Sequence, residues 1–321
     1  PRFAKESAAA HDLFHISDHS YAQLALSLPG GRTGIYCHDL DTFRSVIAPE
    51  TEPRPAWFRM MTQQILAGFR KAAILFCSTS ITKTAIEKHF PNELRRIVIA
   101  PLGISGVFQP QPAIPPSDEV RTVAAASPFI INVGSCIARK RIDLLIQALA
   151  ELRRSVPALK LIKVGGSWQE PHRNLIKSLN LENAIIHFAH LAEADLAELY
   201  RRAELLVVTS EAEGFCLPIA EALACGTAVV ASDLPALREV GGEAVVFFHA
   251  GSAADCAAAC RGALTTARST PLIDARVQRS SLYSWKRHAR IIADAYRHLF
   301  SSIHEQETAH SISTSGMRKG R

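Results

Sequence analysis

The sequence predicts an α/β fold with two domains, each built on a parallel β-sheet. Short apolar segments alternate with amphipathic stretches along most of the chain, which is typical of strands that alternate with helices. The length of 321 residues exceeds that of one ordinary domain. A proline-rich stretch at residues 108–116 separates two such series, and it predicts a linker because proline cannot continue a helix or a central strand.

The first series predicts a small and incomplete domain. Its apolar segments predict strands at residues 12–16, 33–37, 74–77 and 97–100. Its amphipathic segments predict helices near residues 21–28, 57–72 and 82–90. We expect this domain, with the linker, to cover residues 1–125.

The second series predicts a complete doubly wound domain at residues 126–282. Its expected strands cover residues 129–133, 159–164, 184–188, 205–209, 228–231 and 244–248. Its expected helices lie near residues 142–154, 170–179, 194–202, 218–224 and 253–267. A final helix is expected within residues 283–304, and the Ser/Thr-rich tail at residues 305–321 is predicted to be disordered.

Composition excludes several classes of protein. No apolar run approaches the roughly 20 residues that a bilayer crossing needs. The formal net charge is +6, but residues 126–282 carry 16 basic and 16 acidic residues, and residues 283–321 carry 7 against 3. The surplus therefore belongs mostly to the C-terminal end and does not indicate a nucleic-acid partner. Seven cysteines without a CxxC motif predict reduced thiols and a cytoplasmic location.

The richest motif lies at residues 209–227, where an expected strand ends, a loop follows, and Pro218 is placed to open a helix. Such a loop offers free N–H groups to an anion. Two carboxylates, Glu213 and Glu221, flank it and suit the hydroxyls of a ligand that also carries phosphates. The residues alone leave another interpretation open, in which Glu213 is a loop carboxylate and Glu221 is a solvated helix residue.

The motif Glu213-Gly-Phe-Cys-Leu-Pro-Ile-Ala-Glu221 resembles the Glu-x7-Glu signature of retaining GT-B glycosyltransferases of the group-1 family. Other segments resemble this family in the same order along the chain: Tyr36-Cys-His-Asp39, Ile99-Ala-Pro-Leu-Gly-Ile104, Ile131-Asn-Val-Gly-Ser-Cys-Ile-Ala-Arg-Lys-Arg141, Leu161-Ile-Lys-Val-Gly165 and Ala231-Ser-Asp-Leu-Pro-Ala-Leu-Arg238. The resemblance implies two Rossmann-like domains, with residues 1–125 on the acceptor side and residues 126–282 binding the donor. It also implies that the final helix crosses back to the N-terminal domain.

The resemblance also implies roles for single residues. Glu221 is expected to bind the ribose hydroxyls of a nucleotide-diphosphate sugar, and Glu213 is expected to contact the transferred sugar. Lys140 is expected to neutralise the departing diphosphate, with Arg139 beside it. The backbone of a further set is expected to face the diphosphate and sugar: Gly134, Gly214, Phe215, Cys216 and Leu217.

A histidine follows the predicted strand at residues 33–37, at the edge of the sheet where ligands bind in parallel α/β folds. The family places a histidine there, so His38 is expected near the sugar and diphosphate. His15 and His19 are candidates for lining the acceptor side. The nearby Asp39-Leu-Asp41 fits the metal motif of another glycosyltransferase fold, but three residues match easily by chance, and we expect no metal and no cofactor.

Three features depart from the family pattern. Ser135 stands where the family often has Arg, and Cys216 stands where it has a second glycine, which puts the choice of donor in doubt. The chain begins at Pro1, later than the family's first strand and Gly-rich loop, so an N-terminal segment is expected to be missing.

The expected activity is metal-independent transfer of a hexosyl group to an acceptor hydroxyl, with retention of configuration. The expected acceptor is a glycan or a lipid-linked molecule, with peripheral contact to the inner face of the membrane left open. Two alternatives remain: a nucleotide-sugar-binding module without turnover, and a GT-B sugar-nucleotide epimerase. The sequence gives no basis for naming the sugar, the base, the acceptor or the oligomeric state.

Overall fold

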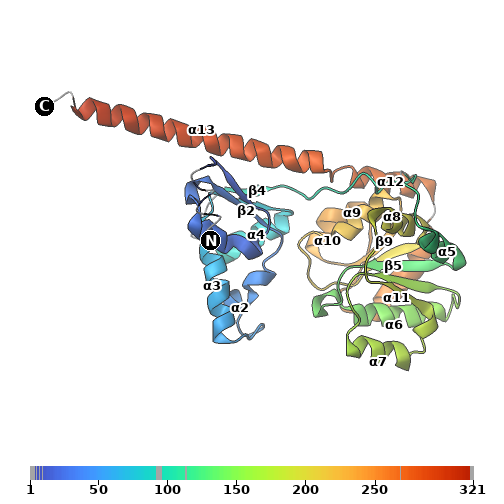
Figure 1. The fold of residues 1–321 in the computed structure, drawn as a ribbon. Coiled ribbons are helices and arrows are strands. Elements are labelled where there is room, and N and C mark those ends of the chain that lie inside the picture. Colours follow the sequence, from blue (N-terminus) through green and yellow to red (C-terminus); the bar gives the residue numbers. More distant parts are fainter. Residues whose placement is uncertain are drawn as a thin grey trace. The chain divides into compact units, whose positions relative to one another are not determined.

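The computed structural model describes residues 10–91, 96–112, 114–267 and 269–318, together with residues 4, 6 and 8. The chain divides into two compact units, of which the first comprises Pro1–Pro101 with Lys286–Arg321 and the second comprises Leu102–Trp285. Each unit holds one sheet of parallel strands with helices packed around it (Figure 1). The predicted fold class, α/β with two Rossmann-like units, is therefore observed.

The sheet of the first unit has four strands in the simple order β1-β2-β3-β4. These strands are β1 (Phe14–Ile16), β2 (Thr33–Cys37), β3 (Ile74–Cys77) and β4 (Arg96–Ile99). Every residue of β2 and β3 is buried, as expected for parallel strands covered on both faces. The core of this unit includes Ile35, Phe43 and Phe69.

The helices of the first unit are mostly short. They are η1 (His19–Ser27), η2 (Gly30–Arg32), η3 (Asp41–Phe43), α2 (Arg44–Ile47), α3 (Ala56–Lys71) and α4 (Ser80–His89). The helix expected near residues 21–28 is observed as η1, a 3-10 helix with a kink at Tyr21. Its backbone lies very close to α3, because a Cβ at Gly68 would stand only 1.9 Å from the Ala22 carbonyl oxygen.

The final helix, α13 (Trp285–Arg318), is longer than expected. Residues 305–318, expected to be disordered, are helical, and this segment contains no proline that would end the helix. Within the first unit, the Tyr296 hydroxyl donates to the Phe14 carbonyl at 2.9 Å, and His288 Nδ1 lies 3.0 Å from the Pro101 carbonyl. A Cβ at Gly34 would lie 2.3 Å from the Tyr296 hydroxyl oxygen, so glycine permits this close packing.

The sheet of the second unit has six parallel strands in the order β10-β9-β8-β5-β6-β7. The strands are β5 (Phe129–Val133), β6 (Lys160–Val164), β7 (Ile185–Phe188), β8 (Leu205–Val208), β9 (Ala228–Ser232) and β10 (Val246–Phe248). The strand order reverses between β5 and β8. In open α/β sheets, the crevice for ligands forms at this reversal, outside the carboxyl ends of the strands.

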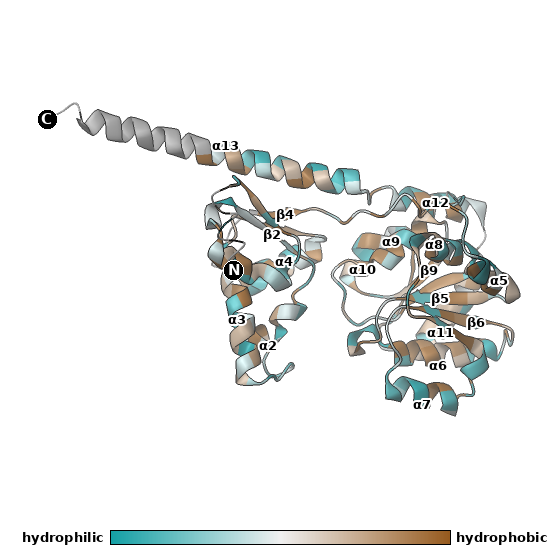
Figure 2. Cartoon of the chain, in the orientation of Figure 1, coloured by the Kyte–Doolittle hydropathy of each residue, from teal (hydrophilic) through white to brown (hydrophobic). Residues whose placement is uncertain are grey.

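Two hydrophobic clusters cover the two faces of this sheet. One lies against α6 (Ile142–Arg153) and α11 (Ala253–Leu264), and the other lies against α8 (Glu193–Arg202) and α9 (Leu217–Ala224). Figure 2 shows the hydrophobic colouring concentrated on the central strands and on the sides of the helices that face them. The remaining elements are η4 (Ala138–Lys140), α7 (Glu170–Ser178), η5 (Glu182–Ala184) and η6 (Gly242–Ala244).

Three helices of the second unit are not among those expected: α5 (Asp118–Ala126), α10 (Pro235–Gly241) and α12 (Thr270–Ser280). Helix α5 begins directly after the proline-rich stretch, where Ser117 Oγ accepts from the Val120 amide. The second unit accordingly starts at Leu102, whereas we expected its domain to start at residue 126. Among the described helices, none combines the length and hydropathy needed to cross a membrane.

Candidate donor-binding site

Two loops meet at the carboxyl edge of the second sheet, one after β5 and one after β8. The Glu211 amide donates to the Arg139 carbonyl at 2.8 Å, and the Thr209 hydroxyl donates to the Lys140 carbonyl at 2.9 Å. Because β5 and β8 flank the reversal of strand order, these bonds join the loops at the expected ligand crevice. The sequence therefore places Arg139 and Lys140 beside the Glu213 loop through sheet topology alone.

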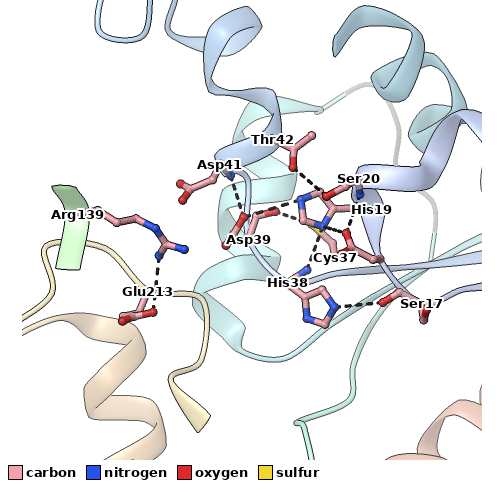
Figure 3. A network of polar contacts seen from close by, with 11 residues as sticks. Ser17, His19, Ser20, Cys37, His38, Asp39, Asp41, Thr42, Arg139 and Glu213 are labelled. Atoms are coloured by element: carbon pink, nitrogen blue, oxygen red, sulfur yellow. Dashed lines mark hydrogen bonds and ion pairs between the residues drawn. The ribbon is translucent and has the colours of Figure 1, made fainter. Parts of the chain in front are cut away.

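The predicted residues Lys140, Arg139 and Glu213 form one charged cluster. Lys140 Nζ lies 2.5 Å from Glu213 Oε1. Arg139 Nη1 lies 3.6 Å from Glu213 Oε2, as Figure 3 shows. Ser210 Oγ also donates to Glu213 Oε1, at 2.7 Å. The Glu213 side chain is only 6% exposed, so these ion pairs are poorly screened by solvent. Two cations against one carboxylate leave the cluster with a positive charge, which suits an anionic ligand.

The loop ends in an unusual turn at Cys216. This residue has φ 74° and ψ 73°, a left-handed conformation that favours glycine, and it caps α9. Burial raises the pKa of the Cys216 thiol, so the thiol stays neutral at physiological pH. The Phe215 ring packs edge-on against Tyr283, with centroids 5.2 Å apart. The role predicted for Gly214, Phe215, Cys216 and Leu217 concerns their backbone. The packing of Phe215 on Tyr283 involves only its side chain.

Glu221 is half-buried on α9 and does not lie on a fully solvated helix face. The Tyr200 hydroxyl, from α8, donates to Glu221 Oε2 at 3.0 Å. Burial raises the pKa of Glu221 to about 7, and the hydrogen bond from Tyr200 opposes this shift. A carboxylate held in this way keeps one oxygen as an acceptor for hydroxyl groups of a ligand.

The loop that starts at Gly134 rests on a lysine that sequence reasoning did not single out. Gly134 has φ 141°, and its amide donates to the Val164 carbonyl at 2.9 Å. Lys163, fully buried in β6, donates from Nζ to the Gly134 carbonyl at 2.5 Å. A lysine inside the apolar run Leu161-Ile-Lys-Val was the signal that could have drawn attention to it.

His38 belongs to the first unit, directly after β2. Its Nε2 donates to the Ser17 carbonyl at 3.1 Å, and its amide lies 3.4 Å from His19 Nδ1 (Figure 3). The ring also lies against Tyr36, with centroids 4.8 Å apart. The structure thus holds His38 in place through neighbours on three segments of its own unit.

The other two candidate histidines, His15 and His19, differ in exposure. His19 is buried between Asp18 and Asp39, with nitrogen–oxygen distances of 3.6 and 3.8 Å, and burial lowers its pKa. His15 Nδ1 contacts the Tyr296 hydroxyl at 2.9 Å, and burial lowers the pKa of His15 as well. Both histidines are therefore mainly neutral near pH 7, and His15 is committed to the contact with α13.

The Asp-x-Asp segment takes part in local structure. Asp39 Oδ1 accepts from the Asp41 amide at 3.0 Å, which stabilises the turn that leads into η3. Across the residues that the structure describes, no group of three or more His, Cys, Asp or Glu side chains is arranged to hold a metal ion. A surface cavity of about 490 Å³ beside α12, lined by Glu243, Arg279 and Leu282, contains none of the predicted site residues.

Comparisons with known proteins add to this geometry. Residues 117–270 match the family model "Glycosyl transferases group 1". The chain is 29% identical over 216 residues to D-inositol 3-phosphate glycosyltransferase of Kineococcus radiotolerans, a match that covers 63% of this chain and 49% of that protein. It is 29% identical over 196 residues to the serotype-specific mannosyltransferase WbdA of Escherichia coli, covering 59% of this chain and 24% of that protein. The chain thus spans about half or less of the length of these relatives.

Solved structures extend the likeness to both units. Sucrose-phosphate synthase from Thermosynechococcus elongatus superimposes with a TM-score of 0.73 and 22% identity, covering 94% of this chain and 77% of that one. Anabaena HepE, solved in complex with UDP-glucose, gives a TM-score of 0.71 and 18% identity, covering 92% and 81%. The two parallel-sheet units are therefore those of the GT-B fold. The residues that match the group 1 glycosyltransferase model, 117–270, all lie in the second unit.

Proposed function

We propose that this protein transfers a hexosyl group from a nucleotide-diphosphate sugar to an acceptor hydroxyl, with retention of anomeric configuration and without a metal ion. The observation that carries the proposal is the charged cluster of Lys140, Arg139 and Glu213, which lies at the reversal of strand order in a group 1 glycosyltransferase domain. A cationic cluster at this edge suits a diphosphate, and its buried carboxylate suits the hydroxyls of a sugar.

Each residue has a distinct part in the proposed reaction. Glu221 accepts hydrogen bonds from the ribose, and the backbone at Gly134, Gly214, Phe215, Cys216 and Leu217 faces the diphosphate and sugar. Glu213 contacts the transferred sugar. Lys140 and Arg139 stabilise the charge that grows on the departing diphosphate, which is the task a metal ion performs in other enzymes. His38 contributes from the first unit, close to the sugar.

Retention without an enzymic nucleophile requires the acceptor to attack from the face that the diphosphate leaves. We infer that the diphosphate departs from the same face that the acceptor attacks, so that the leaving phosphate itself takes the acceptor proton. The bond between the anomeric carbon and the phosphate oxygen breaks, and the bond to the acceptor oxygen forms. Positive charge at Lys140 lowers the energy of the departing phosphate.

The donor and acceptor classes rest on the relatives. A structural neighbour binds UDP-glucose, and sequence relatives are named mannosyltransferase and inositol-phosphate glycosyltransferase. We therefore propose a UDP- or GDP-sugar donor and a glycan or lipid-linked acceptor, with no nucleic-acid partner and a cytoplasmic location.

Peripheral contact with the inner face of a membrane is supported by α3, where Trp57, Met60 and Met61 are exposed beside Arg59. Cosedimentation with anionic vesicles, compared between wild type and Trp57→Ala, tests that contact.

The central test compares two glutamates of one loop. Glu213→Gln removes the buried carboxylate of the charged cluster, whereas Glu211→Gln removes an exposed carboxylate that pairs with Arg141. Thermal shifts with a panel of UDP- and GDP-sugars measure donor binding, because a ligand at about 100 times its Kd adds about 2.7 kcal/mol of stability. We expect the shift in wild type and Glu211→Gln and a marked loss in Glu213→Gln.

The same panel separates the alternatives. Product formed from the stabilising donor and an acceptor, in buffer containing EDTA, supports the proposed transferase. Binding without turnover would instead define a nucleotide-sugar-binding module, and conversion of the donor without any acceptor would define an epimerase. No thermal shift with any nucleotide sugar would contradict the assignment of the donor site.

A further inference from the structure

A charged side chain lies in the interior of β6, next to the candidate site. Lys163 has no exposed surface, and its Nζ donates to the carbonyl oxygens of Gly134, Val164 and Gly165 at 2.5, 2.9 and 2.8 Å. An ammonium group carries three protons, so these three acceptors use its whole donor capacity. Lys163 therefore fastens the turn after β5 to the turn after β6.

These two turns pack backbone against backbone. Gly165 and Gly166 have φ values of 81° and 67°, which only glycine adopts at low cost. A Cβ at Gly166 would lie 2.7 Å from the Cys136 amide nitrogen, and a Cβ at Gly165 would lie 3.1 Å from the Gly134 carbonyl oxygen. The position and orientation of the Gly134 loop thus depend on the turn at Gly165 and Gly166, and on Lys163, which joins the two.

Few anionic groups face this ammonium. Its neighbours in register are Asn132 on β5 and His187 on β7, and His187 Nε2 donates to the Gly166 carbonyl at 2.8 Å. The Cys136 thiol and the Lys140 ammonium act on it from the loop after β5, and His172 does so from α7. Among the described residues, the carboxylates that form ion pairs form them with cations other than Lys163. Burial lowers the pKa of Lys163 to about 8, so a positive charge without a carboxylate partner remains at neutral pH.

We propose that Lys163 is a positioning residue for the donor diphosphate: its buried ammonium fixes the Gly134 loop and supplies positive charge that a bound diphosphate offsets. This inference rests on the proposed donor site of the same sheet edge. A diphosphate near this edge favours the protonated amine, so binding raises the pKa of Lys163. At a pH above the pKa of Lys163 in the free protein, binding therefore takes up a proton from solution. A lysine that only supported the fold would not link nucleotide binding to proton uptake.

The experiment uses the full 321-residue chain and isothermal titration with four probes: UDP, GDP, uridine and guanosine. Three proteins are compared, namely wild type, Lys163→Met and Lys160→Met, because Lys160 begins the same strand and serves as the matched control. We expect Lys163→Met to weaken the nucleoside diphosphate that binds by about tenfold or more at pH 7, with little change for the nucleoside. Wild-type affinity for that diphosphate should fall between about pH 7 and about pH 9, and this fall should be absent in Lys163→Met.

A second measurement does not depend on any variant. Wild type is titrated at about pH 8.5 in buffers of different ionisation enthalpy, and net proton uptake with the diphosphate but not with the nucleoside supports the inference. Unchanged diphosphate affinity in Lys163→Met, or no proton uptake in wild type, overturns it while leaving the proposed function intact. If wild type binds neither diphosphate, the proposed donor site fails, and the role of Lys163 fails with it.

Discussion

The two sheets of this molecule differ in where the chain is strained and charged. In the four-stranded sheet, the strands follow one another in order, and the described non-glycine residues of that unit have ordinary backbone angles. In the six-stranded sheet, the order reverses, and the described non-glycine residues with left-handed backbone are all in this unit: Arg141, Asn180 and Cys216. Arg141 and Cys216 belong to the two loops that meet at the reversal.

The difference shows that residues which lower the stability of the fold are concentrated at the candidate donor site. Residues in left-handed conformations cost of order 1 kcal/mol or more and persist where surrounding structure enforces them. The same edge holds a nearly buried Glu213 with two cations and a fully buried Lys163. The first unit instead holds histidines that burial keeps mainly neutral. We therefore expect the electrostatic part of the reaction to depend on the second unit.

The largest effect is expected from Lys140→Met. Loss of the ammonium removes charge stabilisation of the departing diphosphate, and losses of this kind are about 100-fold to 1000-fold in kcat. His38→Ala, in the first unit, should reduce kcat by less, because the ring already hydrogen-bonds to the Ser17 carbonyl and is not part of the charged cluster around Glu213. Steady-state transfer rates with the donor found in the thermal-shift panel check the order of the two effects. A larger loss for His38→Ala would reverse the comparison between the units.

A second effect concerns the packing of the first sheet against α13. A Cβ at Gly34 would lie 2.3 Å from the Tyr296 hydroxyl oxygen, whereas a Cβ at Gly31 would meet nothing within 4 Å. Gly34→Ala should therefore cost about 1–3 kcal/mol of unfolding free energy, as overpacking usually does, and Gly31→Ala should be nearly neutral. Urea unfolding of both variants measures the difference. Equal stability of the two variants would show that α13 does not pack on β2 in this way.

Most of the fold was predictable from the sequence because apolar segments of a parallel sheet are short and bounded by clear breaks. Each strand in the described part of the chain overlaps an expected segment. One element that was missed, α5, begins directly after the proline-rich stretch, which hid its start from the sequence pattern. The helix to Arg318 lacks the apolar period on which the prediction relied.

The candidate site was predictable only in part. Glu213 and Glu221 stand at a recognisable spacing, but Lys163 is remote from that motif in sequence and joins the site through strand pairing. The ion pair between Lys140 and Glu213 also connects residues 73 positions apart. Such contacts follow from the reversal of strand order, which the local pattern does not encode. The proposed roles of these residues stay predictions until the variants are measured.

Glu221→Gln is expected to have opposite effects on stability and on binding. The pKa of Glu221 is raised from 4.5 to about 7 in the folded protein, so the folded state binds more protons than the unfolded state between these values. Stability from this group is therefore lost as pH rises through that window, and the penalty is complete above about pH 7. Glutamine avoids it, so the variant should gain up to about 2 kcal/mol relative to wild type between pH 4.5 and pH 8.

Donor affinity should change in the other direction, because a neutral amide accepts ribose hydroxyls less strongly than a carboxylate. Unfolding curves at several pH values and nucleotide titrations at pH 8 measure the two quantities. Tyr200→Phe is the companion variant, because it removes the hydroxyl that opposes the rise in the pKa of Glu221. The free energy of unfolding of this variant should therefore continue to fall to a higher pH than in wild type. A pH-independent difference between wild type and Glu221→Gln would contradict the burial of an ionisable carboxylate.

The smallest effect concerns Cys216, where strain and packing oppose each other. Alanine keeps the left-handed strain and loses the buried sulfur, so Cys216→Ala should lose about 1 kcal/mol. Glycine loses the same sulfur but relieves the strain at φ 74°, so Cys216→Gly should be more stable than Cys216→Ala by about 1 kcal/mol. This order is the reverse of that in an ordinary helix, where glycine is the weaker residue by a similar amount. Chemical unfolding of the pair is decisive: if alanine proves the more stable, the loop does not hold Cys216 in the strained conformation, and the contrast between the two sheets loses its clearest mark.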